Sequence, residues 1–255
     1  HADMADVAAW FVSESATPPS ASDASWSTTV PTDYNIQNTS DWSKTVYVYV
    51  KDLAWNISPS RSATIILDRN IPTVNSLNLT GNAWAESGYT NTTNLSISTS
   101  ASDNVGVTWW FISESSSAPA ASSVTGSEPT SFTMSSWDWV HNIYIWSRDA
   151  IWNVSLVRSS SIILDTTINE VDTALTAVNQ WDPVNQTITF NEDVKVISWG
   201  DLWGITISTT SSYSNSLNIS WLASTSWLSN TNITLQDKAW NQKVINISLL
   251  VNEAI

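Results

Sequence analysis

The fold is decided by a stretch that occurs twice: Tyr144–Asp165 reads YIWSRDAIWNVSLVRSSSIILD, and Tyr47–Asp68 reads YVYVKDLAWNISPSRSATIILD. In both copies, apolar and aromatic residues alternate before a D-x-x-W-N-[IV]-S turn, and a β-branched run then ends in Asp. Alternation with period two, a turn and a second apolar run predict a β-hairpin. A weaker third copy, Ile233–Val251, closes the chain. We therefore expect one hairpin to recur in three β-units.

The duplication extends upstream of the hairpin. Asp3–Ser15, DMADVAAWFVSES, matches Asp103–Ser115, DNVGVTWWFISES, with Asp, Val, Trp, Phe, Ser and Glu in register. Self-similarity at a period near a hundred residues predicts tandem domains. We place them at residues 1–70, 71–167 and 168–255.

The first copy is shorter than the second. Ile71–Ser100 precedes the second copy and contains strand-like runs at Ser76–Thr80 and Asn94–Thr99, whereas nothing comparable precedes Asp3. A sandwich without its first strands exposes an edge and part of its core. Either the chain is a fragment of a longer repeat protein, or another chain donates the missing strand.

Composition limits the function classes. Hydrophobic residues make up 42% of the 255 residues and charged residues only 13%, against roughly 25% in average soluble proteins. With 9 basic and 23 acidic residues, the net charge is −14, which argues against nucleic acids and anionic membranes but permits divalent cations. Cysteine is absent, and no apolar run approaches the 18 or so residues of a membrane span.

The secondary structure is predicted to be β throughout, because no window shows sustained helical periodicity. The predicted strands beyond the two runs above are Val7–Ser13, Thr45–Val50, Ala63–Leu67, Val107–Ser113, His141–Ser147, Ser160–Leu164, Thr187–Phe190, Val194–Ser198, Ile205–Ser208, Leu217–Trp221, Asn232–Leu235 and Val244–Val251.

The motifs A-S-D-N-V-G-V, Y-x-x-x-x-D-x-x-x-N-[IV]-S and I-I-L-D resemble those of bacterial Ig-like tandem repeats in large surface adhesins and other secreted modular surface proteins. The likeness covers the first two domains, and the third is similar to a related Ig-like subclass. It implies tandem Ig-like Greek-key β-sandwiches, the first incomplete at its N-terminus. It also implies an extracellular, cell-surface protein that serves as a non-enzymatic spacer, stalk, or subunit of a filament or layer, with copies of itself or neighbouring repeats as partners.

One departure from this family concerns glycine. Trp55, Trp152 and Trp240 stand in the turn where the family has Gly, and Trp42 and Trp139 stand where it tends to have a D-G turn. The chain has 17 Trp and 6 Gly, whereas average usage would give about 18 Gly. The first hypothesis is that some tryptophans stand, by design or by assignment, at positions made for glycine. The alternative is an unusual turn whose exposed Trp side chains bind a ligand.

Carboxylates suggest a calcium site, although no motif requires a cofactor. Hard oxygen ligands suit Ca²⁺, and strand ends gather at the poles of a sandwich. The alternative is that Asp and Asn only form turns, since no D-x-D-x-D-G loop occurs. The predicted ligands at one pole of the second domain are Asp103, Asn104, Asp149, Asn153 and Asp165, and their counterparts in the first domain are Asp3, Asp52, Asn56 and Asp68.

Ten Asn-x-Ser/Thr sequons are candidate glycosylation sites. Their number is a mild excess over chance in a chain so rich in Ser and Thr, so coincidence is the alternative. They lie at Asn38, Asn56, Asn78, Asn91, Asn94, Asn153, Asn185, Asn218, Asn232 and Asn246.

Catalysis has little support, because the two histidines, His1 and His141, have no cysteine or nucleophile motif to work with. We therefore predict that the chain is not an enzyme. The alternative function is carbohydrate binding, with sugars stacked on Trp109, Trp137 and Trp139. Trp110 belongs to a strand duplicated at Trp10, so at least one Trp of that strand is expected in the core.

Overall fold

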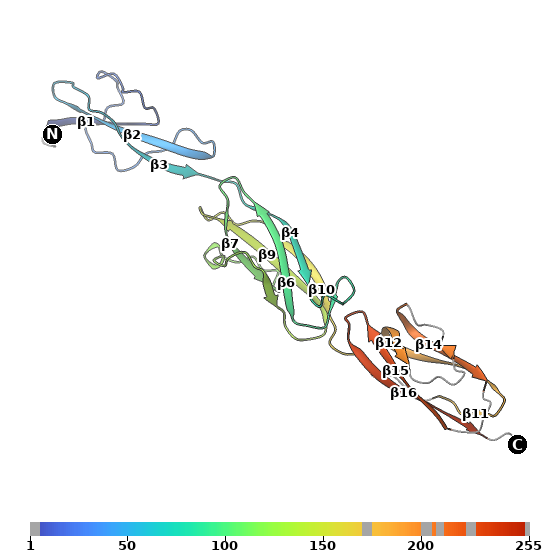
Figure 1. The fold of residues 1–255 in the computed structure, drawn as a ribbon. Helices are drawn as coiled ribbons and strands as arrows, with labels where there is room; N and C mark the ends of the chain where they lie inside the picture. The colour runs from blue at the N-terminus through green and yellow to red at the C-terminus, as the bar shows by residue number, and fades with distance from the viewer. Residues whose placement is uncertain (1–5, 170–174, 200–205, 208–211, 223–227, 253–255) are drawn as a thin grey trace.

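The chain folds into three β-units that follow one another in a line, with the two termini at opposite ends (Figure 1). This computed structural model describes residues 6–169, 175–199, 206–207, 212–222 and 228–252. Every hydrogen-bonded sheet stays within one of the segments 7–67, 73–164 and 178–252. We call the three parts of the chain around these segments, divided at 70/71 and 167/168, the first, second and third units. None of the described helices is long and apolar enough to cross a bilayer.

The second unit is a two-layer sandwich. One sheet has the order β5-β10-β9-β7 and the other has the order β4-β6-β8. Alternating residues of the two sheets enclose a core in which Leu95, Ile143 and Ile145 are at most 1% exposed. Its strands are β4 (Thr73–Thr80), β5 (Tyr89–Thr90), β6 (Asn94–Ser102), β7 (Val107–Ser113), β8 (Ser131–Thr133), β9 (Trp139–Asp149) and β10 (Arg158–Leu164).

The first unit repeats one of these sheets with the same register. Strands β1 (Val7–Ser13), β2 (Trp42–Asp52) and β3 (Arg61–Leu67) pair in that order, as β7, β9 and β10 do. Trp10 lies opposite Val50, and its counterpart Trp110 lies opposite Ser147. Both pairings carry an irregularity two residues into the first strand. The duplication read from the sequence is therefore present in the backbone.

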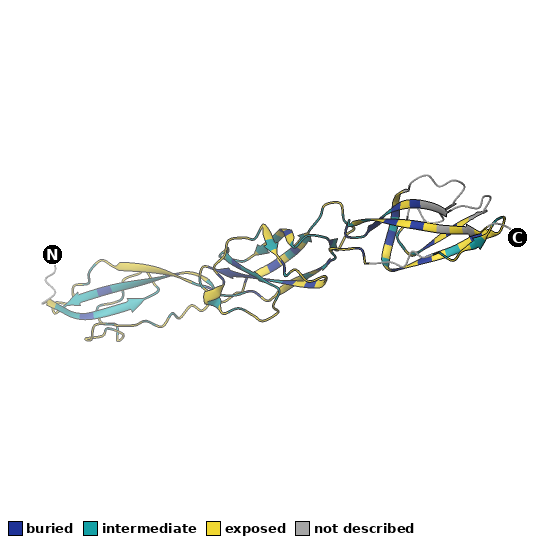
Figure 2. Ribbon diagram, turned by 90° about the horizontal axis from the view of Figure 1, so that it is seen from below, coloured by how far each residue is buried: buried dark blue, intermediate teal, exposed yellow. Residues whose placement is uncertain are grey.

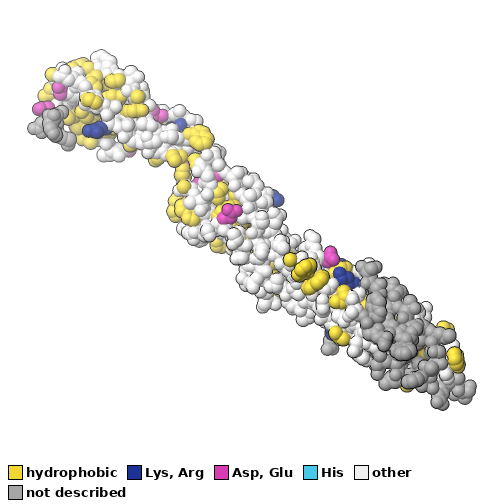
Figure 3. All heavy atoms as spheres, viewed as in Figure 1, with side chains coloured by type: hydrophobic (Ala, Val, Ile, Leu, Met, Phe, Trp, Pro, Cys, Tyr) yellow, Lys and Arg dark blue, Asp and Glu magenta, His cyan; other side chains and the backbone are white. Residues whose placement is uncertain are grey.

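The first unit has one sheet in the described part of the chain, so one of its faces is open. Ile65 is 58% exposed, whereas Ile162, its counterpart in the second unit, is 3% exposed. Figure 2 shows few buried residues in the first unit, and Figure 3 shows hydrophobic side chains gathered over it. The difference arises because β4 and β6 cover the equivalent face in the second unit, where β4 packs against β10.

The third unit contains a six-stranded sheet of order β11-β16-β15-β12-β14-β13 that bends around its own core. Thr187–Phe190 and Val194–Ser198 were predicted as separate strands, but they form one strand, β12. It pairs first with β14 and then, beyond an irregularity between Thr189 and Val194, with β15. The bend lets one strand serve both layers. The strands are β11 (Val178–Asn179), β12 (Pro183–Trp199), β13 (Thr206–Ile207), β14 (Ser214–Leu222), β15 (Leu228–Asp237) and β16 (Gln242–Asn252).

The architecture is thus all-β, a series of Ig-like sandwiches in which the first is represented by a single sheet. The domain bounds predicted at 70/71 and 167/168 fall between β3 and β4 and between β10 and β11.

Candidate metal centres and aromatic sites

The same Asp–Asn turn closes the hairpin in each unit. Asn153 donates from its backbone N–H and from its side-chain amide to the carboxylate of Asp149, at 2.9 and 2.7 Å. Asn56 with Asp52, and Asn241 with Asp237, repeat both bonds at 2.7–2.9 Å. The Asp side chain accepts hydrogen bonds from donors of the turn that would otherwise be free, which is why the Asp-x-x-x-Asn spacing recurs.

The turn also joins one unit to the unit before it. The side-chain amide of Asn153 donates to the backbone oxygen of Asp68 at 3.2 Å, and that of Asn241 donates to the backbone oxygen of Asp165 at 2.8 Å. Asp68 and Asp165 are the last residues of the two I-I-L-D runs. The hairpin turn of a unit therefore docks on the end of the preceding hairpin.

Three carboxylates meet at the first of these joints. Oxygen atoms of Asp68, Asp103 and Asp149 all lie within 4.8 Å of one another. Asp68 is 6% exposed and Asp149 is fully buried. Asn104 donates from its side-chain amide to Oδ1 of Asp68 at 3.0 Å, which ties the start of β7 to the same point. The first and second units thus share one compact acidic cluster.

This arrangement corrects the predicted ligand grouping. Asp165 does not join Asp103 and Asp149, and Asp52 with Asn56 does not join Asp68. In each hairpin the turn lies at one end and the closing Asp at the other, because Trp139 pairs with Leu164 and Trp42 pairs with Leu67. The 11-residue strands β2 and β9 separate the two ends by about 35 Å. Asp3 lies outside the described residues.

The second joint holds a different acidic cluster, formed by Asp165, Glu192 and Asp237. Burial raises the pKa of Asp165 above its ordinary value, and the nearby Asp237 charge raises it further. Burial likewise raises the pKa of Glu192. Asp237 was open to prediction from the third copy of the turn motif. Glu192 was missed, because only the bend of β12 brings it here.

The second joint carries further contacts. The backbone N–H of Glu86 donates to the backbone oxygen of Lys238 at 2.8 Å. The rings of Trp84 and Trp240 stack with their centroids 5.9 Å apart. A cavity of about 160 Å³ lies beside the cluster, and Lys238, which is paired with Asp193 at 2.7 Å, lines it. The second and third units are therefore held by apolar, backbone and side-chain contacts together.

Every non-glycine residue with a positive φ in the described part of the chain is a tryptophan. The values are Trp42 104°, Trp55 68°, Trp139 159°, Trp152 79°, Trp181 74° and Trp240 76°. Apart from Trp139, which is close to extended backbone, these residues occupy the region that L-residues with bulky side chains avoid. The backbone confirms that the Trp55, Trp152 and Trp240 turn positions are glycine-type. Trp181 was not singled out from the sequence.

The predicted sugar-binding tryptophans do not form one platform. Trp109 pairs with Arg148 near the end of β9, whereas Trp139 begins that strand, about 30 Å away. The face of Trp109 is occupied, because the Arg148 guanidinium lies 4.3 Å from its ring centroid and 4.0 Å from that of Trp152. Trp137 lies against His141 at 4.3 Å. Trp110, as expected for this strand, is buried.

Arg148 has a counterpart in the first unit. Lys51 lies 4.8 Å from the Trp26 ring and 4.6 Å from the Trp55 ring. Each cation also donates to a loop carbonyl: Lys51 to Ala21, and Arg148 to Ala121. The duplicated cation packs a loop onto its sheet and explains part of the aromatic content.

The sequons differ in exposure. Asn153 is half-buried, and its side-chain amide is engaged by Asp149 and Asp68. A glycan at this nitrogen would displace both bonds. Asn91 is also half-buried. The remaining candidates are exposed, and they are Asn38, Asn56, Asn78, Asn94, Asn185, Asn218, Asn232 and Asn246.

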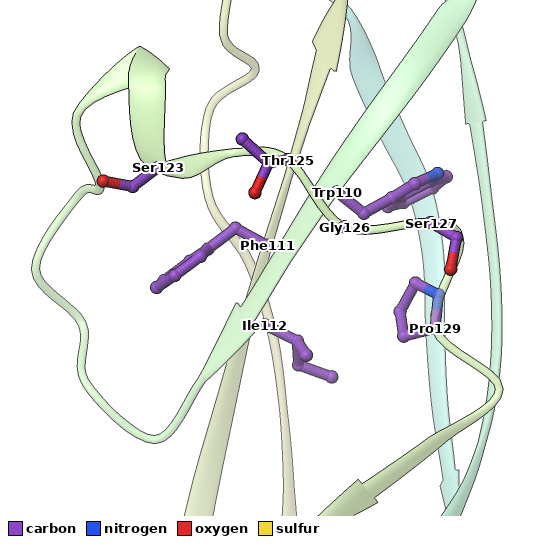
Figure 4. A pocket seen from close by; sticks show the side chains of 8 residues that line it. All are labelled: Trp110, Phe111, Ile112, Ser123, Thr125, Gly126, Ser127 and Pro129. Carbon is purple, nitrogen blue, oxygen red and sulfur yellow. The ribbon is translucent and has the colours of Figure 1, made fainter.

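A cavity beside β7 is not suited to acid–base chemistry. It measures about 350 Å³ and lies between β7 and the loop at residues 123–129. Figure 4 shows its walls, which are Trp110, Phe111, Ile112, Ser123, Thr125, Gly126, Ser127 and Pro129. No carboxylate, imidazole or amine lines it, so it offers no general acid or base.

No protein-family model and no curated protein matches the sequence. Among solved structures, the chain is similar to the D00-D0 domain of intimin, with 13% identity and a TM-score of 0.35 over 69% of this chain and 99% of that one. The I67–I69 fragment of titin is 11% identical, with a TM-score of 0.35 over 84% of this chain and 75% of that one. Domains 4 and 5 of the S-layer protein SbsC are 10% identical, with a TM-score of 0.26 over 70% of this chain and 98% of that one. Such likeness concerns fold and transfers no function.

Proposed function

We propose that this chain is a non-enzymatic, extracellular structural protein that holds other parts of a cell-surface assembly at a distance. The observation that carries the proposal is the docking of each hairpin turn on the preceding unit, through Asn153 to Asp68 and Asn241 to Asp165. A tether needs no such contacts, whereas a spacer with a defined length does.

The surface supports the same role. It is polar but largely uncharged, and Figure 3 shows scattered carboxylates and few cations. Ser, Thr and Asn supply this polarity without the long-range fields that steer nucleic acids or anionic membranes to a protein. The similar structures include an adhesin and an S-layer protein, which are the settings in which we place this chain.

The open face of the first unit supports assembly with another copy or with a neighbouring repeat. Ile65 is 58% exposed on the face whose counterpart in the second unit is covered by β4 and β6. A donated strand pair of the same kind would bury this face. Such assembly makes the chain a subunit of a filament or layer as well as a spacer.

Small-angle X-ray scattering on the full chain tests the spacer role. We expect a rod with three β-units in series and a narrow distribution of end-to-end distances. A broad distribution that resembles freely jointed domains would refute the role. The measurement is repeated at several concentrations, because association through the first unit would lengthen the apparent rod.

A further inference from the structure

The first joint has a feature that turn formation does not explain. Oδ2 of Asp68 and Oδ1 of Asp103 are both buried, and neither has a hydrogen-bond partner. Buried carboxylate oxygens are ordinarily satisfied, since an unpaired buried charge is costly. Two such oxygens in one cluster, beside the fully buried Asp149, point to a missing positive charge.

The remaining oxygens of these side chains are already used. Oδ1 of Asp68 accepts from the Asn70 N–H and from the Asn104 amide. Oδ2 of Asp103 accepts from the N–H groups of Val105 and Gly106 at 2.9 and 3.1 Å. These bonds leave Oδ2 of Asp68 and Oδ1 of Asp103 as the buried oxygens without a partner. Among the residues that the structure describes, no Lys or Arg side chain pairs with any of the three carboxylates.

We propose that Asp68, Asp103 and Asp149 bind one Ca²⁺ at the joint between the first and second units. Three carboxylates with fixed orientation are a hard-oxygen ligand set, which suits Ca²⁺ better than softer metals. Asp68 comes from one unit and the other two ligands come from the next, so the site is complete only when the units are docked. Bound Ca²⁺ therefore fixes the angle between them.

The first test measures binding by the full chain after dialysis against EDTA. Calorimetric titration with CaCl₂ should show a dissociation constant of about 10⁻⁴–10⁻³ M, the range of extracellular modules. Tb³⁺ luminescence excited through nearby tryptophan should rise and be quenched by Ca²⁺. Absence of both signals would overturn the proposal, and water would then be the partner of the two buried oxygens.

The decisive variant is Asp68→Asn. It keeps an oxygen for the Asn70 and Asn104 bonds but replaces an ion ligand with an amide. We expect the melting temperature without calcium to rise, because like-charge repulsion is relieved, and the response to calcium to fall at least about tenfold. A purely structural Asp68 would instead give a lower melting temperature and an unchanged calcium response.

Asp52→Asn is the matched control. Asp52 makes the same turn bonds as Asp149. However, Asp52 belongs to neither of the two acidic clusters among the described residues. The variant should keep the calcium response of the parent chain. An equal loss in both variants, or an equal shift with Mg²⁺, would show general charge screening and refute the site.

A second inference rests on the backbone and the composition. In the described part of the chain, every non-glycine residue with a positive φ is a tryptophan; five of the six lie in the left-handed region, and Trp139 is the counterpart of one of these, Trp42, in the duplicated hairpin. The chain has 17 Trp but 6 Gly. The codon UGA is read as tryptophan in some genetic codes and as glycine in others. We infer that the natural polypeptide carries glycine at Trp42, Trp55, Trp139, Trp152, Trp181 and Trp240, encoded by UGA.

The gene and the natural protein test this inference. We expect UGA at these six positions and UGG at the buried Trp110 and Trp146, which are 7% and 2% exposed in the core. Peptide mass spectrometry of protein from its native source should show glycine at the six positions and tryptophan at the two core positions. UGG codons, or tryptophan in those six peptides, would overturn the inference.

Discussion

The side-chain amide of Asn241 donates a 2.8 Å hydrogen bond to the backbone oxygen of Asp165, which lies 76 residues earlier in the chain. Asn153 repeats this bond to Asp68 at the preceding joint. In both joints the donor is the last residue of the D-x-x-W-N motif. One local turn thus closes a hairpin and also connects it to the preceding unit.

Asn153→Ala and Asn241→Ala should loosen the joints. Each removes one hydrogen bond between units, worth roughly 0.5–1.5 kcal/mol, together with the turn bonds to Asp149 or Asp237. Distances between spin labels on neighbouring units should broaden. Asn56→Ala is the control, because Asn56 makes the turn bonds in the first unit. Equal broadening of the same label pair in the control would contradict the docking role.

Glu114 should make the second unit sensitive to acid. Burial tends to raise the pKa of Glu114, but hydrogen bonds from His141 and Ser135 outweigh burial and lower the pKa below its ordinary value of 4.5. A lowered folded-state pKa stabilises the fold above the unfolded pKa, and this stabilisation is lost as the pH falls through the folded value. The protection factors of the β9 amides, which correct hydrogen exchange for its intrinsic pH dependence, should therefore fall between about pH 5 and pH 3.

Glu114→Gln is the check on this acid response. The amide cannot titrate, so the contribution of Glu114 to the pH dependence of β9 exchange should vanish. The bond between His141 Nδ1 and Glu114, at 2.5 Å, is the contact that the variant weakens. An unchanged slope in the variant would assign the acid response to other carboxylates.

Trp181→Gly and Trp42→Gly should stabilise the chain. Relief of the left-handed backbone strain stabilises the fold by roughly 1–2 kcal/mol, but the greater conformational freedom of glycine in the unfolded chain offsets about half of this gain. We expect the free energy of unfolding, measured with denaturant, to rise by about 1 kcal/mol. Both side chains are exposed, at 61% and 59%. Trp137→Gly, exposed at 54% but without a positive φ, should lower stability.

Ile65→Asn should weaken self-association of the full chain. The residue is exposed on the open face of the first unit, where its counterpart Ile162 is buried. Sedimentation velocity should show a lower apparent mass at matched concentration. Val244→Asn, on an equally exposed site of β16, should change nothing. A peptide of residues 71–102, the natural cover of this face in the second unit, should compete with association, and failure to compete would argue against strand donation.

Much of the fold could be predicted from the sequence, because its signals are local. The predicted strands Val7–Ser13 and Val107–Ser113 match β1 and β7 residue for residue. The glycine-type turns followed from a motif of five residues. Alternation and turn chemistry act over a few neighbouring residues, so no knowledge of the tertiary fold was needed.

The candidate sites were less accessible to prediction. Asp149 and Asp165 are 16 residues apart, and the sequence alone placed them together, but a hairpin puts its turn and its closing residue at opposite ends. Glu192 reaches the second joint only because β12 bends between the layers.

By itself, the sequence determined the repeated hairpin, the all-β class and the Asp–Asn turn, since each depends on side chains within a short span. Only the tertiary structure decided that Asp68 meets Asp103 and Asp149 across a joint, and that two of their oxygens lack partners. The reason is physical: the meeting depends on strand length, hairpin polarity and the docking of one unit on the next, which no single segment encodes.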